Sequence, residues 1–308
     1  MKRAVTICCI GALSLLLFAT PGRSEMGTID ETMFESNATV NLHINPVFVF
    51  AGAEHVANGV ALRNAARGTI ALRGIPLGST VVKAYLYWNF SNMSAVGVSG
   101  DYVFFDGNLA GGIKVADSPD PCWGMSGNHT YRADVTGFIP SIRPNGDYEF
   151  LRGGVSTSGQ NPFVAETQTT RMEGATLVVV YKNASTTGNT VSLYDSLSGS
   201  TFSNATGTFT LNHSARFGSG LFTMCGADGQ RTAYTNSASN EKGTFNGTQF
   251  SGPPVAASDW DGSAGWPLVQ LWDVHTHQVT LNGTTSVVVY TAGSDCLVPV
   301  LYVIQSGL

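Results

Sequence analysis

The chain has 308 residues, of which only 12% are charged, against about 25% in an average soluble domain. Its formal net charge of -5 at pH 7 leaves no basic excess for a phosphate backbone, which argues against a nucleic-acid partner. The length fits one large β domain or two domains of ordinary size.

The first 24 residues have the pattern of a cleaved export signal. Lys2 and Arg3 supply the positive start, Ala4 to Ala19 the apolar core, and Gly22-Arg23-Ser24 a small-residue cleavage site. A retained anchor or a lipoprotein is the alternative. No later apolar stretch reaches the roughly 18 residues that a membrane span needs. We therefore expect a secreted protein, periplasmic or extracellular, without a membrane span.

Short strands follow the leader, and no helical periodicity is convincing. The strands expected in the first half are Thr39–Phe50, Thr69–Leu72, Val81–Trp88, Tyr102–Phe105 and Gly174–Tyr181. The Pro76-Leu77-Gly78 turn predicts a hairpin between the second and third of these strands. Asp106-Gly107 predicts a tight turn after the fourth. The fifth is nearly all apolar, which predicts burial on both faces.

A polar stretch from Ala184 to Asn189 predicts a boundary between two modules. The strands expected beyond it are Thr190–Tyr194, Thr206–Asn212, Leu221–Met224, Val269–Trp272, Gln278–Leu281, Val287–Tyr290 and Leu297–Ile304. We therefore predict an all-β protein with two tandem antiparallel β-sandwich modules of jelly-roll type, at residues 25–185 and 186–308. One large sandwich is the alternative.

The two halves also share a pattern, in which an Asp-Val pair precedes an Asn-Gly turn and a long apolar strand. In the first half the Asp-Val pair begins at Asp134 and the Asn-Gly turn at Asn145. In the second half they begin at Asp273 and Asn282. The repetition favours one β-rich module used twice.

Several motifs resemble those of a type of uncharacterised secreted microbial surface-protein domain. The matching segments are Gly59–Asn64, Gly68–Ile70, Gly74–Pro76, Val81–Trp88, Pro121–Gly124, Tyr131–Thr136, Gly174–Tyr181 and Leu271–Val274. The resemblance covers about residues 59 to 304 and implies a secreted β-sandwich, with no implied activity. The Asp134-Val135-Thr136 stretch also resembles one in galactose-binding-like sandwiches, which implies an aspartate at a strand entry that binds backbone.

Removal of the leader leaves three cysteines, Cys122, Cys225 and Cys296. An oxidising compartment favours one disulfide among them. We predict Cys225 with Cys296, because both lie in the second module. Cys122 with Cys225 is the alternative pairing.

The strongest candidate for metal binding is Asp273, His275 and His277. On a strand these residues share one face, where two imidazoles and a carboxylate suit Zn²⁺ or Cu²⁺. The competing interpretation is a solvated polar face. Asp259 and Asp261 form a carboxylate pair in a loop that suits Ca²⁺, as do Asp117 and Asp120, although aspartates in such loops commonly serve only the turn.

Three loop tryptophans, Trp123, Trp260 and Trp266, are candidates for stacking on a sugar ring. They favour a non-enzymatic cell-surface or matrix protein that binds a glycan or another protein through its loops. One alternative is an extracellular metal-dependent or carboxylate-using hydrolase. Another is a self-assembling filament subunit, in which Glu25–Phe50 adds to a neighbour's sheet.

Overall fold

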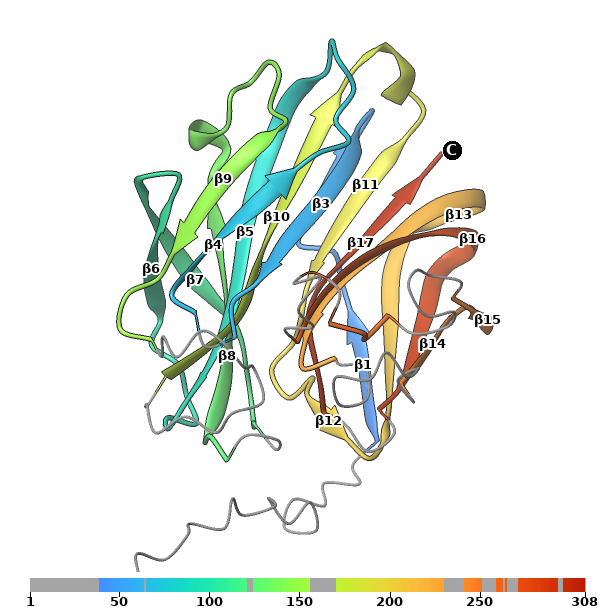
Figure 1. Cartoon of the computed structure of the whole chain (residues 1–308). Coiled ribbons are helices and arrows are strands. Elements are labelled where there is room, and N and C mark those ends of the chain that lie inside the picture. Colours follow the sequence, from blue (N-terminus) through green and yellow to red (C-terminus); the bar gives the residue numbers. More distant parts are fainter. Residues whose placement is uncertain are drawn as a thin grey trace, which may run out of the picture. The chain divides into compact units, whose positions relative to one another are not determined.

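The computed structural model describes residues 39–63, 65–120, 124–155, 170–229, 241–250, 259–262, 264, 271–292 and 296–307. Over these residues the chain is all-β, with two short 3-10 turns, η2 (Thr136–Phe138) and η3 (Ala184–Thr186) (Figure 1). The predicted fold class is confirmed, and the expected leader at residues 1–24 lies outside the described residues. Both sheets belong to one compact unit, Phe34–Leu308. Within the described part no helix is long and apolar enough to cross a bilayer.

The first sheet has eight antiparallel strands in the order β3-β10-β5-β8-β7-β6-β9-β4. They are β3 (Glu54–Ala61), β4 (Arg67–Leu72), β5 (Thr80–Asn92), β6 (Gly100–Phe105), β7 (Asn108–Ser118), β8 (Gly127–Asp134), β9 (Gly146–Leu151) and β10 (Thr170–Lys182). The two edge strands approach each other, since a Cβ at Gly68 would lie 2.7 Å from the Val60 side chain. The sheet thus curls around its own core, which includes Trp88, Phe105 and Phe150.

Strand partners in this sheet follow length and burial more than proximity in the chain. Asp106 and Gly107 have positive φ, 49° and 76°, and join β6 to β7 as predicted. The hairpin predicted between β4 and β5 is wrong, because β4 pairs with β9 whereas β5 lies between β10 and β8. The long apolar β5 needs a partner on each side, which leaves the short β4 at the edge.

Strand β10 is buried on both faces, as predicted, from Arg171 to Tyr181. Leu177 and Val179 face the core of the first sheet, whereas Val178 and Val180 face the second sheet. This strand therefore contributes to two cores at once.

The second sheet has nine strands, in the order β15-β14-β16-β13-β17-β11-β2, with β1 paired to β13 and β12 to β17. They are β1 (Val40–Ile44), β2 (Phe48–Ala51), β11 (Thr190–Asp195), β12 (Phe202–Ser203), β13 (Thr206–Ala227), β14 (Lys242–Phe245), β15 (Thr248–Gln249), β16 (Trp272–Thr291) and β17 (Cys296–Ser306). Thus β1 and β2 precede the first sheet in sequence but pair with the second. That residues 25–185 and 186–308 are separate modules stays a prediction.

Two long curved strands, β13 and β16, replace the four shorter strands expected at 206–212, 221–224, 278–281 and 287–290 (Figure 1). They pair along their length except for a register shift between Asn212 and Arg216. Opposite the shift, Gly283 has φ 107°, so the predicted Asn282-Gly283 turn is an irregularity within β16. Both halves of β13 contribute to one core, through Phe209 and Phe222.

A third core lies between the two sheets. Trp272 of β16 packs against Gly174 of β10, where a Cβ would lie 2.2 Å from the indole ring. The indole Nε1 donates to Thr176 Oγ1 at 3.0 Å. The glycine therefore admits the tryptophan, and the two sheets pack closely at this point.

Candidate functional site

Trp260 is not an exposed stacking residue, because its side chain is 0% exposed. Its ring meets that of Tyr290 edge-on, with centroids 5.2 Å apart, and lies where a Cβ at Gly226 would come within 2.1 Å of it. The prediction that Trp260 binds a ligand is wrong, because the loop folds back and buries its largest apolar group. Trp123 and Trp266 lie outside the described residues.

The aspartates and histidines predicted to bind metal are buried and do not lie on a solvated face of the second sheet. His275 Nε2 lies 3.3 Å from Asp261 Oδ1 and 3.4 Å from Asp273 Oδ1. His277 Nε2 lies instead 2.5 Å from Asp259 Oδ1. The structure thus separates the five residues into an Asp261–Asp273–His275 cluster and a His277–Asp259 pair.

Backbone and side-chain contacts hold both groups. The Asp261 N–H donates to Asp273 Oδ1 at 3.1 Å, which ties the loop to β16. The Tyr290 hydroxyl donates to Asp259 Oδ2 at 3.2 Å, and the Phe250 ring stacks on His277 with centroids 4.6 Å apart. The carboxylates of Asp259 and Asp261 therefore have different partners.

Burial changes the proton affinity of the cluster. Burial raises the pKa of Asp273 well above its usual range. Burial alone would lower the pKa of His275, but hydrogen bonds to Asp261 and Asp273 outweigh it and raise that pKa. At neutral pH the cluster therefore retains protons.

Asp117 of the other predicted calcium pair is also engaged by protein groups. Asp117 accepts from Lys114 Nζ at 2.6 Å, and its other oxygen lies 2.8 Å from His129 Nδ1. A lysine ammonium at that carboxylate leaves no reason to place a cation there.

The predicted Cys225–Cys296 disulfide is wrong, because Cys225 carries a free buried thiol, which also excludes the alternative pairing with Cys122. Cys225 is in register with Leu301 of β17, five residues from Cys296, which corresponds to roughly 16 Å along a strand. A disulfide needs Cα atoms within about 7 Å. Cys296 is itself disulfide-bonded.

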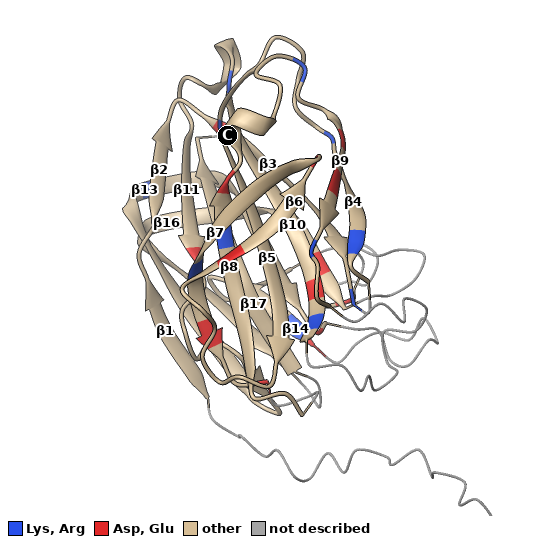
Figure 2. Cartoon of the chain, turned by 90° about the vertical axis from the view of Figure 1, so that its left-hand side faces the viewer, with Lys and Arg blue, Asp and Glu red and all other residues tan. Residues whose placement is uncertain are grey.

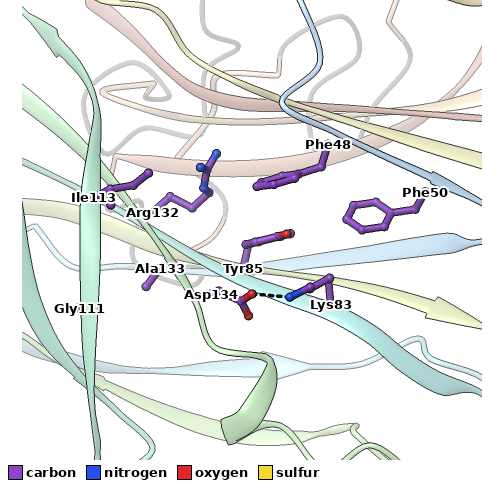
Figure 3. Close-up of a pocket in the computed structure, with 9 residues that line it drawn as sticks. All are labelled: Phe48, Phe50, Lys83, Tyr85, Gly111, Ile113, Arg132, Ala133 and Asp134. Carbon is purple, nitrogen blue, oxygen red and sulfur yellow. Dashed lines mark hydrogen bonds and ion pairs between the residues drawn. The ribbon is translucent and has the colours of Figure 1, made fainter.

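An open cleft of about 450 Å³ lies where β2 meets the face of β5, β7 and β8 (Figure 3). Aromatic and charged side chains line it, together with three other residues: Phe48, Phe50, Tyr85, Lys83, Arg132, Asp134, Gly111, Ile113 and Ala133. Figure 2 shows that basic and acidic residues lie near one another around β7 and β8. The cleft thus combines ring faces with ionised groups.

The aromatic wall comes from both sheets. Phe48 and Phe50 share one side of β2 because strand side chains alternate. The Phe48 ring lies parallel to that of Tyr85, with centroids 4.6 Å apart and an interplanar angle of 8°. The Phe50 ring is 6.2 Å from that of Phe48. The stacked pair holds the wall in place, with Phe50 beside it.

Arg132 is held at the cleft by a buried network. Its guanidinium donates to Asp195, which also accepts from the Tyr87 hydroxyl at 2.6 Å. The guanidinium carbon lies 4.8 Å from the centre of the Phe48 ring, a cation–π distance. A guanidinium has five N–H donors, so this placement leaves donors for a ligand.

The opposite rim carries an exposed ion pair, Lys83 with Asp134, 2.6 Å apart. The hydrogen bond to Asp134 raises the pKa of Lys83. Partial burial alone would raise the pKa of Asp134, but hydrogen bonds from Lys83 and Thr136 lower it. Both groups are therefore ionised at neutral pH. Asp134 Oδ1 also accepts from the Thr136 N–H at 3.0 Å.

Sequence reasoning missed this cleft. The signal within the sequence was the alternation of Phe48 and Phe50, two aromatic rings on one side of a short strand. That signal does not reveal that β2 would lie beside Tyr85 and Arg132 of the other sheet. Only pairing between β2 and β11 brings the rings there.

No family model and no curated protein matches this chain. Among solved structures, a chain of the Sputnik virophage, determined by cryo-EM, is similar at 8% sequence identity and TM-score 0.20, covering 99% of this chain and 91% of that one. The tandem CBM51 modules of a family 98 glycoside hydrolase from Streptococcus pneumoniae are similar at 9% identity and TM-score 0.21, covering 80% and 82%. At such values neither likeness carries an argument, and no family is assigned.

Proposed function

We propose that the protein is a non-enzymatic binding protein that takes a glycan in the cleft between β2 and the face of β5, β7 and β8. The observation that supports this most is the placement of the Phe48 and Phe50 rings beside Arg132 and the Lys83–Asp134 pair. Export, expected from residues 1–24, would bring such a protein into contact with extracellular or periplasmic glycans.

The chemistry of the cleft suits a sugar ring. The C–H face of a sugar packs on an aromatic ring, while its hydroxyls take hydrogen bonds from groups around the rim. Lys83 and Arg132 supply donors, and Asp134 supplies acceptors. The volume of about 450 Å³ falls within the range of about 300–1,000 Å³ that is typical of small-ligand sites.

A glycan array with neutral and acidic oligosaccharides, followed by calorimetric titration of the best ligand, tests the proposal. Loss of one stacking ring costs about 1.5 kcal/mol, so we expect Phe50→Ala to weaken binding about tenfold. Phe217→Ala is the matched control, because Phe217 is 75% exposed on β13 and does not line the cleft.

Two results would overturn the proposal. One is an array on which the folded wild-type protein binds nothing. The other is a Phe50→Ala variant that binds the best ligand as tightly as wild type and the Phe217→Ala control. Lys83→Met tests the polar contribution, because it keeps the aromatic rings and removes one hydrogen-bond donor. We expect this variant also to bind the glycan more weakly.

A second candidate is binding of a protein surface. Four large apolar side chains are exposed along the β6–β7 hairpin: Tyr102, Phe104, Leu109 and Ile113. Phe104 and Leu109 are direct cross-strand partners, so the hairpin presents an apolar stripe that reaches the cleft at Ile113. Light scattering over a concentration series tests one form of this binding, self-association. A mass that grows with concentration and reverts in Phe104→Ser would support it, whereas a constant monomer mass would rule that form out.

The hydrolase alternative lacks support from the described residues. Asp261 and Asp273 are fully buried and His275 is 8% exposed, so a substrate of any size does not reach them in this structure.

A further inference from the structure

The Asp261–Asp273–His275 cluster contains three metal-ligating groups of two kinds. Asp273 and His275 come from β16, and Asp261 comes from the loop that precedes it. One ligand atom from each residue lies within 4.8 Å of the other two. Carboxylates and imidazoles are seldom buried together unless they pair with one another or bind a cation.

His275 lies within ion-pair range of both carboxylates, but at distances longer than those of a short charge-assisted hydrogen bond. A charge-assisted hydrogen bond between an imidazolium and a carboxylate measures about 2.7–2.9 Å. His275 Nε2 stands 3.3 Å from Asp261 Oδ1 and 3.4 Å from Asp273 Oδ1. Ligands at about 2.0–2.1 Å from a tetrahedral Zn²⁺ are separated by roughly 3.3–3.4 Å. The spacing of the nitrogen from both oxygens thus matches two edges of a zinc tetrahedron.

The surrounding fold holds the three groups in position. Asp273 and His275 are two residues apart on β16 and therefore point to the same side. The loop carrying Asp261 is anchored by the buried indole of Trp260 and by the hydrogen bond from the Asp261 N–H to Asp273 Oδ1. Two elements thus present ligands without further rearrangement.

His277, although it lies on the same face, is engaged elsewhere. Its Nε2 is 2.5 Å from Asp259 Oδ1, a hydrogen-bonding distance, and Asp259 also accepts from Tyr290. The rings of His275 and His277 are 6.3 Å apart. His277 and Asp259 therefore pair beside the cluster and do not contribute ligands to it.

The geometry points to a binding site for one divalent cation of the zinc type, held by Asp261, Asp273 and His275, with a fourth position for water. A nitrogen ligand and a short ligand spacing disfavour Ca²⁺, which takes six to eight oxygen ligands at about 2.3–2.6 Å. A mixed nitrogen and oxygen set suits Zn²⁺. The cation would fasten the 259–262 loop to β16. This site is independent of glycan binding in the cleft.

The test begins with protein that has been treated with a chelator to remove metal and then shown to be folded. This protein is titrated with zinc. We expect one equivalent of Zn²⁺ to bind and to raise the melting temperature. His275→Gln and Asp261→Asn should each weaken binding by more than the about 10- to 100-fold that loss of an outer partner causes. Circular dichroism establishes that each variant is folded before the comparison.

His277→Gln is the matched control, because it changes the same residue type two positions along the same strand. It should retain one equivalent of Zn²⁺ and most of the thermal shift. X-ray absorption of the zinc-loaded wild type should give a shell of nitrogen and oxygen ligands.

Several outcomes would overturn the inference. They are folded wild-type protein that binds no Zn²⁺, zinc binding that His275→Gln leaves unchanged, and stabilisation by Ca²⁺ in place of Zn²⁺. If the variants do not fold, a wild-type absorption spectrum without nitrogen ligands is sufficient to reject the site.

Discussion

His55 of β3 is a buried histidine whose hydrogen bonds suit the neutral imidazole. Nδ1 lies 2.9 Å from Gln305 Oε1, and Nε2 lies 2.7 Å from Thr223 Oγ1. The neutral ring can donate from Nδ1 to the amide oxygen and accept the threonine hydroxyl proton at Nε2. A second proton, on Nε2, would have to be donated to Thr223 Oγ1. The threonine can accept it only if its own hydroxyl hydrogen turns away from the ring.

Burial lowers the pKa of His55 from 6.5 to about 4, which the hydrogen bond to Gln305 only partly offsets. Between these two values the unfolded chain binds a proton that the folded chain does not, so stability rises with pH across this window. We expect His55 to contribute about 3 kcal/mol more at pH 7 than at pH 4. Urea unfolding at several pH values, compared between wild type and His55→Gln, measures the difference. Equal pH slopes for the two proteins would contradict the prediction.

Single residues also show where local patterns mislead. Trp260 sits beside two aspartates in a loop, a context that suggests exposure, yet its ring is a core group. The spacing of Asp273 and His275 did predict that both lie on one face of the strand, but that face is buried. Local sequence indicates which side chains lie together and does not indicate what covers them.

At the scale of elements, the packing of β10 on β16 depends on one glycine. The backbone of Gly174 lies against the indole of Trp272, and the indole in turn bonds to Thr176 Oγ1. No space is available for a methyl group at residue 174, because the hydrogen bond to Thr176 holds the Trp272 indole in place.

We therefore expect Gly174→Ala to lower the free energy of unfolding by about 1–3 kcal/mol, as overpacked cores do. Gly137→Ala is the control, since a Cβ at Gly137 meets no atom within 4 Å. Urea titration gives both values. Adding Trp272→Phe to the alanine variant should cost less than the sum of the single changes, because the two sites are in contact. Equal stability of the two alanine variants would refute this account of the packing.

The existence of most strands could be predicted, but their partners could not. Apolar or aromatic runs and turn chemistry identified β5, β6 and β10, since these signals lie within a few residues. The predicted pairing of β4 with β5 failed because register depends on which distant strand covers each edge. For the same reason β1, which pairs in parallel with β13 from Val40 to Ile44, had no sequence signal for its partner.

At the scale of the whole molecule, Cys225 lies in the core between the sheets. Its Sγ is 3.0 Å from Thr176 Oγ1 of the first sheet. Burial raises the pKa of this thiol above its ordinary value, so it stays protonated and unreactive.

We expect iodoacetamide to leave Cys225 unmodified in the folded protein and to alkylate it after unfolding without reductant. Peptide mapping under non-reducing conditions should find Cys296 cross-linked to a peptide that does not contain Cys225. Cys225→Ser should keep that cross-link. A cross-linked peptide containing Cys225 would contradict the arrangement of β13 against β17.

The sequence by itself determined the all-β class, the tight turn at Asp106-Gly107 and the burial of β10, because each depends on neighbouring residues along the chain. Tertiary structure alone decided the pairing of β2 with β11, which brings Phe48 onto Tyr85. It likewise decided that Asp261 meets His275 and that Cys225 does not reach Cys296. These arrangements join residues far apart in sequence, so they depend on which sheet faces cover one another and not on any local pattern.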